Sequence, residues 1–163
     1  MGQSLLTIAA MMLLSVISLR MNAAIFLSQD TSQNSKFGLA AISLATSQIE
    51  EASRLAFDEN SIDNPLSAVA YLTSSGLLGK ETGESTPDLY DDLDDYNNYT
   101  TVDSSQISAV FNVWMRVSYV NGNALNSVSA VPTWHKKITV KVASPFMRDT
   151  ISISSIFSYW TFR

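Results

Sequence analysis

Cysteine is missing from the whole 163-residue sequence, and its absence removes three kinds of chemistry at once. Without a thiol, the chain can form no disulfide, no thiolate metal site and no cysteine nucleophile. Charge is also scarce, because charged residues make up 15% of the chain against about a quarter in ordinary soluble domains. So little charge indicates that apolar residues are buried somewhere outside a single compact core.

Basic residues are too few to serve a polyanion, with ten lysines and arginines against fifteen aspartates and glutamates. No basic stripe is present that could neutralise a phosphate backbone, so we expect no nucleic-acid partner. The single histidine, His135, has no cysteine or distinctive serine near it with which to build a zinc site or a catalytic triad. We interpret it as an exposed histidine at the edge of a strand.

Sequence patterns typical of enzymes are missing as well. The chain contains no GxGxxG, Walker, HExxH or GxSxG pattern. We therefore predict that the protein is not an enzyme and that it needs no organic cofactor.

Glycine and proline are nearly missing from the first third of the chain, where Gly2 and Gly38 are the only such residues. Leucine, alanine and methionine dominate from Leu5 to Leu27, a stretch whose only charge is Arg20. This composition favours an unbroken helix. A helix needs about 20 apolar residues to cross a bilayer. Residues 5–27 reach that length if the Arg20 side chain extends its charge to the membrane interface. We expect a membrane or filament-core segment over residues 4–27.

Two other interpretations of this segment are weaker. A cleaved signal peptide would need a basic residue before its apolar core, and no lysine or arginine precedes Leu5. A helix buried inside a soluble core would need more surrounding surface than a chain of this length provides.

The helical pattern continues beyond the apolar segment with apolar residues on one side only. After the polar stretch at residues 28–35, apolar residues recur mostly at spacings of three and four, namely Phe37, Leu39, Ala40, Ile42, Leu44, Ile49, Ala52, Leu55 and Ala56. One helix from Ser4 to Asp58 would be about 80 Å long. We expect a bend in it at Gly38 and the polar stretch.

The chain after Glu59 has the composition of loops and then of strands. Residues 60–106 carry turn-forming clusters and predict a loop-rich connection, with a short helix around Pro65 to Leu72. Apolar and polar residues then alternate in three segments that we predict to be strands: 111–119, 136–144 and 149–160. Asn121-Gly122 indicates a turn, but the pattern of residues 124–132 is irregular and does not predict a hairpin partner.

These elements predict an α+β fold in two parts. Residues 1–59 form a long helix, apolar in its first half and amphipathic in its second. Residues 60–163 form a loop-rich head with a small antiparallel β-sheet. We expect the amphipathic half of the helix to pack its apolar side against this sheet.

Two local motifs resemble those of a known family. The acidic run at residues 90–97, YDDLDDYN, is similar to the DDVDDY/F-N-G loop of MshD-type minor pilins, and KKITVKV at residues 136–142 is similar to part of their C-terminal sheet. The predicted architecture likewise resembles that of type IV pilins and pseudopilins. The resemblance implies a subunit of an extracellular type IV pilus-like filament on the cell surface. Such a filament is a helical homo-oligomer whose subunits reside in the inner membrane before assembly.

The beginning of the chain departs from the pilin pattern. Pilins carry a basic leader ending in glycine, and the fifth residue of the processed chain is a glutamate. Cleavage after Gly2 would make Thr7 the fifth residue, and an N-terminus at Met1 would make it Leu5. Neither residue is a glutamate, so we do not expect the family's docking of that carboxylate on a neighbour's terminal amine.

We predict that copies of the apolar helix assemble through close packing of small residues such as Ala9, Ala10, Ser15 and Ser18. The candidate assembly residues are Leu5, Leu6, Ala9, Ala10, Leu13, Leu14 and Ile17. The alternative function is a single-span membrane-anchored binding module, such as an adhesin or a minor or priming pilin. Hydropathy alone fits such an anchor equally well.

The acidic run is the candidate metal site. Asp91, Asp92, Asp94 and Asp95 offer the carboxylate oxygens that Ca²⁺ prefers. The spacing does not follow the EF-hand pattern, which has a glycine at its sixth position and a closing glutamate. A solvated acidic loop without an ion is therefore the default interpretation, and a calcium site is the alternative.

Overall fold

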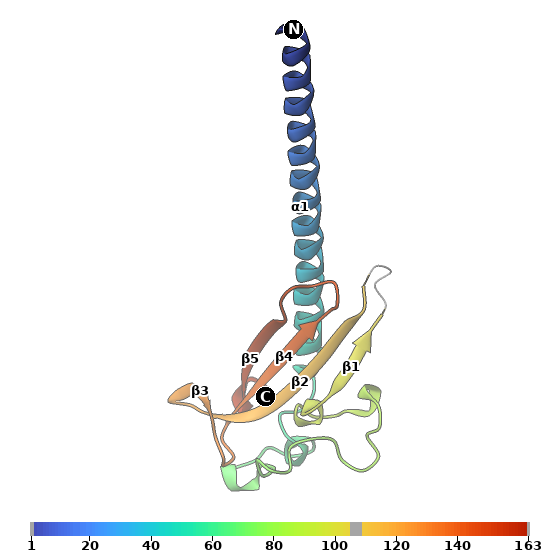
Figure 1. The fold of residues 1–163 in the computed structure, drawn as a ribbon. Coiled ribbons are helices and arrows are strands. Elements are labelled where there is room, and N and C mark those ends of the chain that lie inside the picture. Colours follow the sequence, from blue (N-terminus) through green and yellow to red (C-terminus); the bar gives the residue numbers. More distant parts are fainter. Residues whose placement is uncertain (1, 105–108, 163) are drawn as a thin grey trace.

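The protein consists of a long helix that carries a sheet domain at one end (Figure 1). The computed structural model describes residues 2–104 and 109–162. Helix α1 spans Gly2–Ala52, and its N-terminal part projects far beyond the head. An antiparallel sheet packs against the C-terminal part of this helix. The predicted α+β class is therefore confirmed.

Helix α1 is unbroken, and the prediction of a bend at Gly38 is wrong. The helix runs straight through this residue (Figure 1). A single glycine lowers the stability of a helix but does not force the chain to turn. The polar stretch at residues 28–35 is helical too, and the hydroxyls of Thr31 and Ser35 bond to carbonyls one turn earlier in the same helix without breaking it.

The helix ends at Ala52, earlier than the predicted end at Asp58. The backbone of Ala56 is bound instead to the acidic run. Its N–H donates to the Asp91 carbonyl and its own carbonyl accepts from the Leu93 N–H, both at 2.9 Å. A residue whose backbone pairs with a distant segment cannot also continue the helix.

In the described part of the chain, five strands form one sheet, and all their pairings are antiparallel. The strand order is β1-β2-β4-β5, and β3 pairs with the end of β2. The strands are β1 Thr100–Asp103, β2 Phe111–Asn121, β3 Ala124–Val128, β4 His135–Ala143 and β5 Ile151–Ser158. The three predicted strands correspond to β2, β4 and β5 with slightly shifted ends.

The segment after the Asn121-Gly122 turn forms a hairpin in its first part, so the prediction that residues 124–132 are irregular is wrong there. Strand β3 lies antiparallel to the end of β2, with Val128 opposite Val120 and an irregular register next to Asn121. All of β3 is exposed, so its sequence shows no alternation of buried and exposed positions. Strand β1 was missed within the predicted loop region because it is short and only half-buried.

The connection between α1 and β1 is loop-rich, as predicted. Within residues 53–99 the structure has four short 3₁₀ helices: η1 Glu59–Ser61, η2 Val69–Tyr71, η3 Pro87–Leu89 and η4 Asp94–Tyr96. The helix predicted around Pro65 to Leu72 is thus reduced to η2. The Leu66 N–H donates to the Tyr159 hydroxyl at 2.6 Å, so a tertiary contact rather than a helical bond holds the backbone there.

The main core lies between one side of α1 and the inner face of the sheet. The buried residues of the helix are Ala41, Ala45, Ile49 and Ala52, and three alanines among four allow a close approach to the strands. The inner face of β2 and β4 includes the buried residues Val113, Met115, Val117, Ile138, Val140 and Val142. The amphipathic half of the helix therefore packs on the sheet as predicted.

Candidate functional site

All seven predicted assembly residues lie on the exposed part of α1 that we call the apolar arm, residues 2–27. They are Leu5, Leu6, Ala9, Ala10, Leu13, Leu14 and Ile17, and their spacing places them along one side of the helix. Leu6 is 73% exposed and even Ile17 is 47% exposed. No residue of the described head covers them, since the most apolar window of the helix contains no buried residue.

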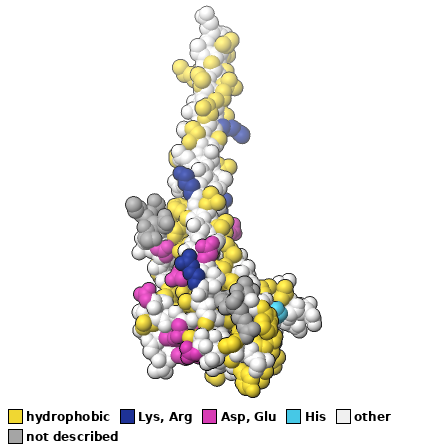
Figure 2. Space-filling model, turned by 180° about the vertical axis from the view of Figure 1, so that it is seen from behind, with side chains coloured by type: hydrophobic (Ala, Val, Ile, Leu, Met, Phe, Trp, Pro, Cys, Tyr) yellow, Lys and Arg dark blue, Asp and Glu magenta, His cyan; other side chains and the backbone are white. Residues whose placement is uncertain are grey.

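The other sides of the arm are apolar as well. Ile8, Met11, Met12, Val16 and Leu19 are also exposed. Figure 2 shows hydrophobic side chains distributed along the arm, with few charged ones among them. The helix is long and apolar enough to cross a membrane, by length and composition. A helix that is apolar all round is normally buried, so the arm is suited to a bilayer or to packing against other protein.

Two hydroxyl groups of the arm bond to the backbone of their own helix. Thr7 Oγ1 donates to the Ser4 carbonyl and Ser15 Oγ to the Met11 carbonyl, each at 2.9 Å. A hydroxyl bonded in this way needs no water, so it can face lipid or a neighbouring helix at low cost. These polar residues are therefore compatible with an apolar environment.

The loop between β4 and β5 contacts α1 just beyond the arm. The Arg148 guanidinium forms an exposed ion pair with Asp30, and the backbone N–H of Arg148 donates to Asn34 Oδ1 at 3.1 Å. The rings of Phe37 and Phe146 also meet here, with their centroids 5.7 Å apart. These contacts mark the boundary between the free arm and the part of the helix that belongs to the head.

The acidic run is largely buried, so its interpretation as a solvated loop is wrong. Asp92, Asp94 and Asp95 are each 1% exposed, and Asp91 alone among the four faces water. The reason is Lys136 in β4, whose side chain is fully buried with its Nζ 2.5 Å from Asp94 Oδ1. A buried ammonium needs buried carboxylates around it to offset the loss of its hydration.

Asp58 provides the second carboxylate for Lys136, at 2.9 Å from Nζ. It also accepts hydrogen bonds from the Tyr119 hydroxyl at 2.9 Å and from the Thr73 N–H at 3.1 Å. Burial raises the pKa of Asp58, but the attraction of Lys136 and these hydrogen bonds outweigh it and hold the pKa below its usual value. Our sequence reasoning missed Asp58, although Asp58 and Ser61 have the spacing of the helix cap that they form.

The acidic run folds back on its own backbone amides. Asp92 Oδ1 accepts hydrogen bonds from the N–H groups of Asp94 and Asp95, at 2.7 and 3.2 Å. Asp95 Oδ2 in turn accepts from the N–H groups of Asp91 and Asp92, at 3.1 and 3.2 Å. Burial and the nearby Asp94 raise the pKa of Asp92 to about 10. Calcium binding by the four aspartates of this run stays a prediction.

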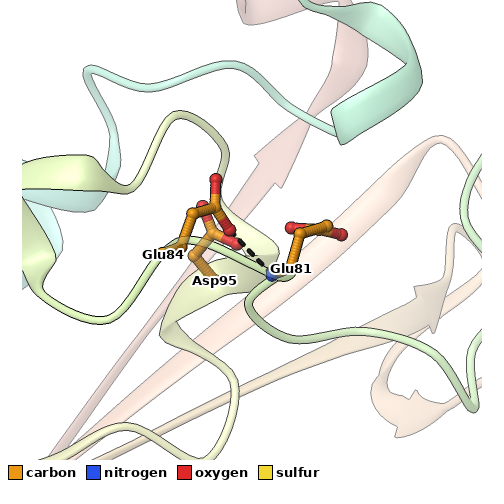
Figure 3. A group of neighbouring side chains, drawn as sticks. All are labelled: Glu81, Glu84 and Asp95. Atoms are coloured by element: carbon orange, nitrogen blue, oxygen red, sulfur yellow. Dashed lines mark hydrogen bonds between the residues drawn. The ribbon is translucent and has the colours of Figure 1, made fainter.

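Asp95 lies beside two glutamates that our sequence reasoning missed. Glu81, Glu84 and Asp95 each offer an oxygen within 4.8 Å of the others (Figure 3). Burial and the surrounding carboxylates raise the pKa of Glu81 to about 8, and burial and Glu84 raise the pKa of Asp95 to about 6. No sequence pattern signals this group, because irregular loop structure rather than helical or strand spacing brings it together.

His135 is not the exposed edge histidine that we predicted. It is half-buried at the start of β4, a strand that lies between β2 and β5. Its Nδ1 lies 2.8 Å from the Ser158 hydroxyl on β5. A contact across two paired strands explains the burial, and it gives the ring a structural partner.

Comparison of the chain with protein-family models, with curated proteins and with solved structures finds no match. The likeness to type IV pilins therefore rests on the architecture and on the motifs at residues 90–97 and 136–142. The structure joins these two motifs directly through the Lys136–Asp94 pair. The architecture, a sheet domain on a helix that could anchor in a membrane, is compatible with a pilin but is not specific to one.

Proposed function

We propose that the protein is a structural, non-enzymatic subunit of an extracellular type IV pilus-like filament. The observation that supports this function is the apolar arm, which stands clear of the head and is apolar on all sides. In a helical homo-oligomer the arms pack against one another in the filament core, and the heads form the outer surface. Before assembly, the same arm resides in the inner membrane.

In this proposal, close packing rather than the hydrophobic effect drives assembly. A helix that moves from lipid into a bundle buries no further apolar surface from water, so its association depends on van der Waals contact between closely spaced backbones. Ala9, Ala10, Ser15 and Ser18 are small residues that allow such an approach. The hydroxyl of Ser15 is already bonded within its own helix, so it does not resist burial.

The test is to replace Ala9 or Ala10 by tryptophan and to examine purified material by negative-stain electron microscopy. We expect both variants to lose filaments while the heads keep the circular dichroism spectrum of the unsubstituted protein, because the described residues of the arm are all exposed. Ala9→Ser is the matched control, since it keeps a small residue at the same position and should still form filaments. Intact filaments from both tryptophan variants would refute assembly through these residues.

The alternative function is a single-span membrane-anchored binding module, such as an adhesin or a minor or priming pilin. The observation that favours it is that α1 has the length and composition to cross a bilayer. Imaging of the native protein separates the two functions. A filament subunit gives fibres, whereas an anchored module gives isolated particles bound to detergent.

A further inference from the structure

Three carboxylates from two separate segments converge on one edge of the head. Glu81 and Glu84 belong to the loop before η3, and Asp95 belongs to η4 at the end of the acidic run. One oxygen of each lies within 4.8 Å of the others, and Figure 3 shows the carboxylates of Glu84 and Asp95 side by side with Glu81 close to them. The Glu81 N–H donates to Glu84 Oε2 at 2.7 Å, which holds the two glutamates together.

Asp95 supplies a second and independent observation. Its side chain is 1% exposed, and its Oδ2 is held in place by two backbone N–H groups. Its other oxygen, Oδ1, is buried and accepts no hydrogen bond from any N–H or hydroxyl group of the described structure. A buried carboxylate oxygen without a partner is costly, so a group that would satisfy it is needed at this position.

No ion pair with a lysine or arginine meets this need within the described residues. The buried Lys136 is paired with Asp58 and Asp94. Arg148 is paired with Asp30 of α1, just beyond the arm. None of the described ion pairs includes Glu81, Glu84 or Asp95. Carboxylates this close together need either shared protons or an external cation between them.

We propose that Glu81, Glu84 and Asp95 bind a Ca²⁺ ion. The donor set consists of oxygen alone, which suits a hard cation and not Zn²⁺, whose usual ligands include nitrogen and sulfur. Two oxygens bound to one Ca²⁺ at about 2.5 Å lie at most about 5 Å apart, so carboxylate oxygens that all lie within 4.8 Å of one another can share one ion. Mg²⁺, with bonds of about 2.1 Å and a strict octahedral geometry, demands a tighter arrangement.

The bound ion joins a loop to the core of the head. Glu81 is exposed and Glu84 is half-buried, so one side of the ion is open to water, which completes the coordination. The buried side is Asp95, whose neighbour Asp94 pairs with Lys136. Calcium therefore fastens the loop before η3 onto the polar network beneath it. This site is independent of the filament function, because none of its three residues lies on the arm.

The experiment is calorimetric titration of the full-length protein in detergent with CaCl₂ after removal of cations by a chelator. We expect one Ca²⁺ per chain, a dissociation constant of about 10⁻⁴ to 10⁻³ M as in other extracellular modules, and weaker binding of Mg²⁺. The midpoint of thermal unfolding should rise with the calcium concentration, since a ligand of the folded state stabilises it. Absence of both binding heat and a thermal shift would overturn the proposal.

Matched variants locate the ion. Glu81→Gln and Glu84→Gln should each weaken calcium binding about tenfold or more, because the affinity of such sites follows the number of charged ligands. Asp88→Asn removes an exposed carboxylate of the same loop region and should bind calcium as the unsubstituted protein does. Asp95 is left intact because it also holds the backbone of the acidic run. If both glutamine variants bind as tightly as Asp88→Asn, or if Asp91→Asn alone abolishes binding, the ion does not occupy this site and the assignment is wrong.

Discussion

Lys136 is the residue on which the buried polar network of the head depends. Its Nζ lies between Asp58 and Asp94, and the ring centroids of Phe57 and Tyr119 are 4.8 and 5.3 Å away. Such a network adds little stability compared with a well-packed apolar cluster, because desolvation of the charges nearly cancels their attraction. Removal of the Lys136 ammonium alone has a much larger effect on stability, because the two buried carboxylates then lack a counter-charge.

We predict that Lys136→Met lowers the free energy of unfolding by about 3–5 kcal/mol, because it leaves buried aspartates uncompensated. The measurement is urea denaturation of the full-length protein in detergent, followed by the fluorescence of its tryptophans. Lys137→Met is the control, as this adjacent residue is only half-buried and has no part in the network. The free energy of unfolding of Lys137→Met should stay within about 0.5 kcal/mol of that of the unsubstituted protein. Equal midpoints for the two variants would contradict the role of the buried ion network.

Helix α1 serves two environments with one continuous backbone. Its first half presents apolar side chains in every direction, and its second half buries only the side that faces the sheet. Gly38 lies where the helix enters the head, yet the helix does not bend there. The glycine has no close neighbour, since a Cβ built on it meets no atom within 4 Å.

We predict that Gly38→Ala raises the free energy of unfolding by up to about 1 kcal/mol, because alanine loses less backbone entropy in a helix than glycine does. Thermal unfolding followed by circular dichroism measures the change. Gly79→Ala is the contrasting variant, because Gly79 has a φ of 137° that a residue with a Cβ rarely adopts. This variant should have a lower free energy of unfolding than the unsubstituted protein. A lower stability of Gly38→Ala would mean that the continuous helix does not describe the protein in solution.

The protein divides into an arm whose described residues are all exposed and a head that includes the end of the same helix. The buried helix residues begin at Ala41, and the exposed Arg148–Asp30 pair lies just beyond the arm. Both clusters of buried apolar residues therefore lie outside residues 2–27. The stability of the head and the assembly of the arm should be separable properties.

We predict that a chain lacking residues 1–27 is monomeric and soluble without detergent. Its free energy of unfolding should match that of the full-length protein within about 0.5 kcal/mol, because the deleted residues contribute no core contacts. Size-exclusion chromatography with light scattering measures the mass, and urea denaturation measures the stability. Oligomers of the shortened chain would show that the head itself carries an assembly surface.

Local pattern was enough to predict the framework of this protein. The composition of residues 5–27 predicts a helix that is apolar all round, and the spacing from Phe37 onward predicts its one-sided continuation. Alternation predicts β2, β4 and β5, since in each of them more buried and more exposed positions alternate. These features depend on residues within a few positions of one another, so they can be read along the chain.

Contacts between distant segments established the rest. Lys136 lies 78 and 42 positions from its partners Asp58 and Asp94, so no local pattern could show that the acidic run is buried. The early end of α1 depends on the pairing of Ala56 with the same run. The meeting of Glu81 with Asp95 likewise depends on irregular loops, whose paths follow from packing rather than from periodicity. The hydrophobic pattern of the chain thus specified its helix and main strands, whereas folding in three dimensions specified which charges are buried and which of them meet.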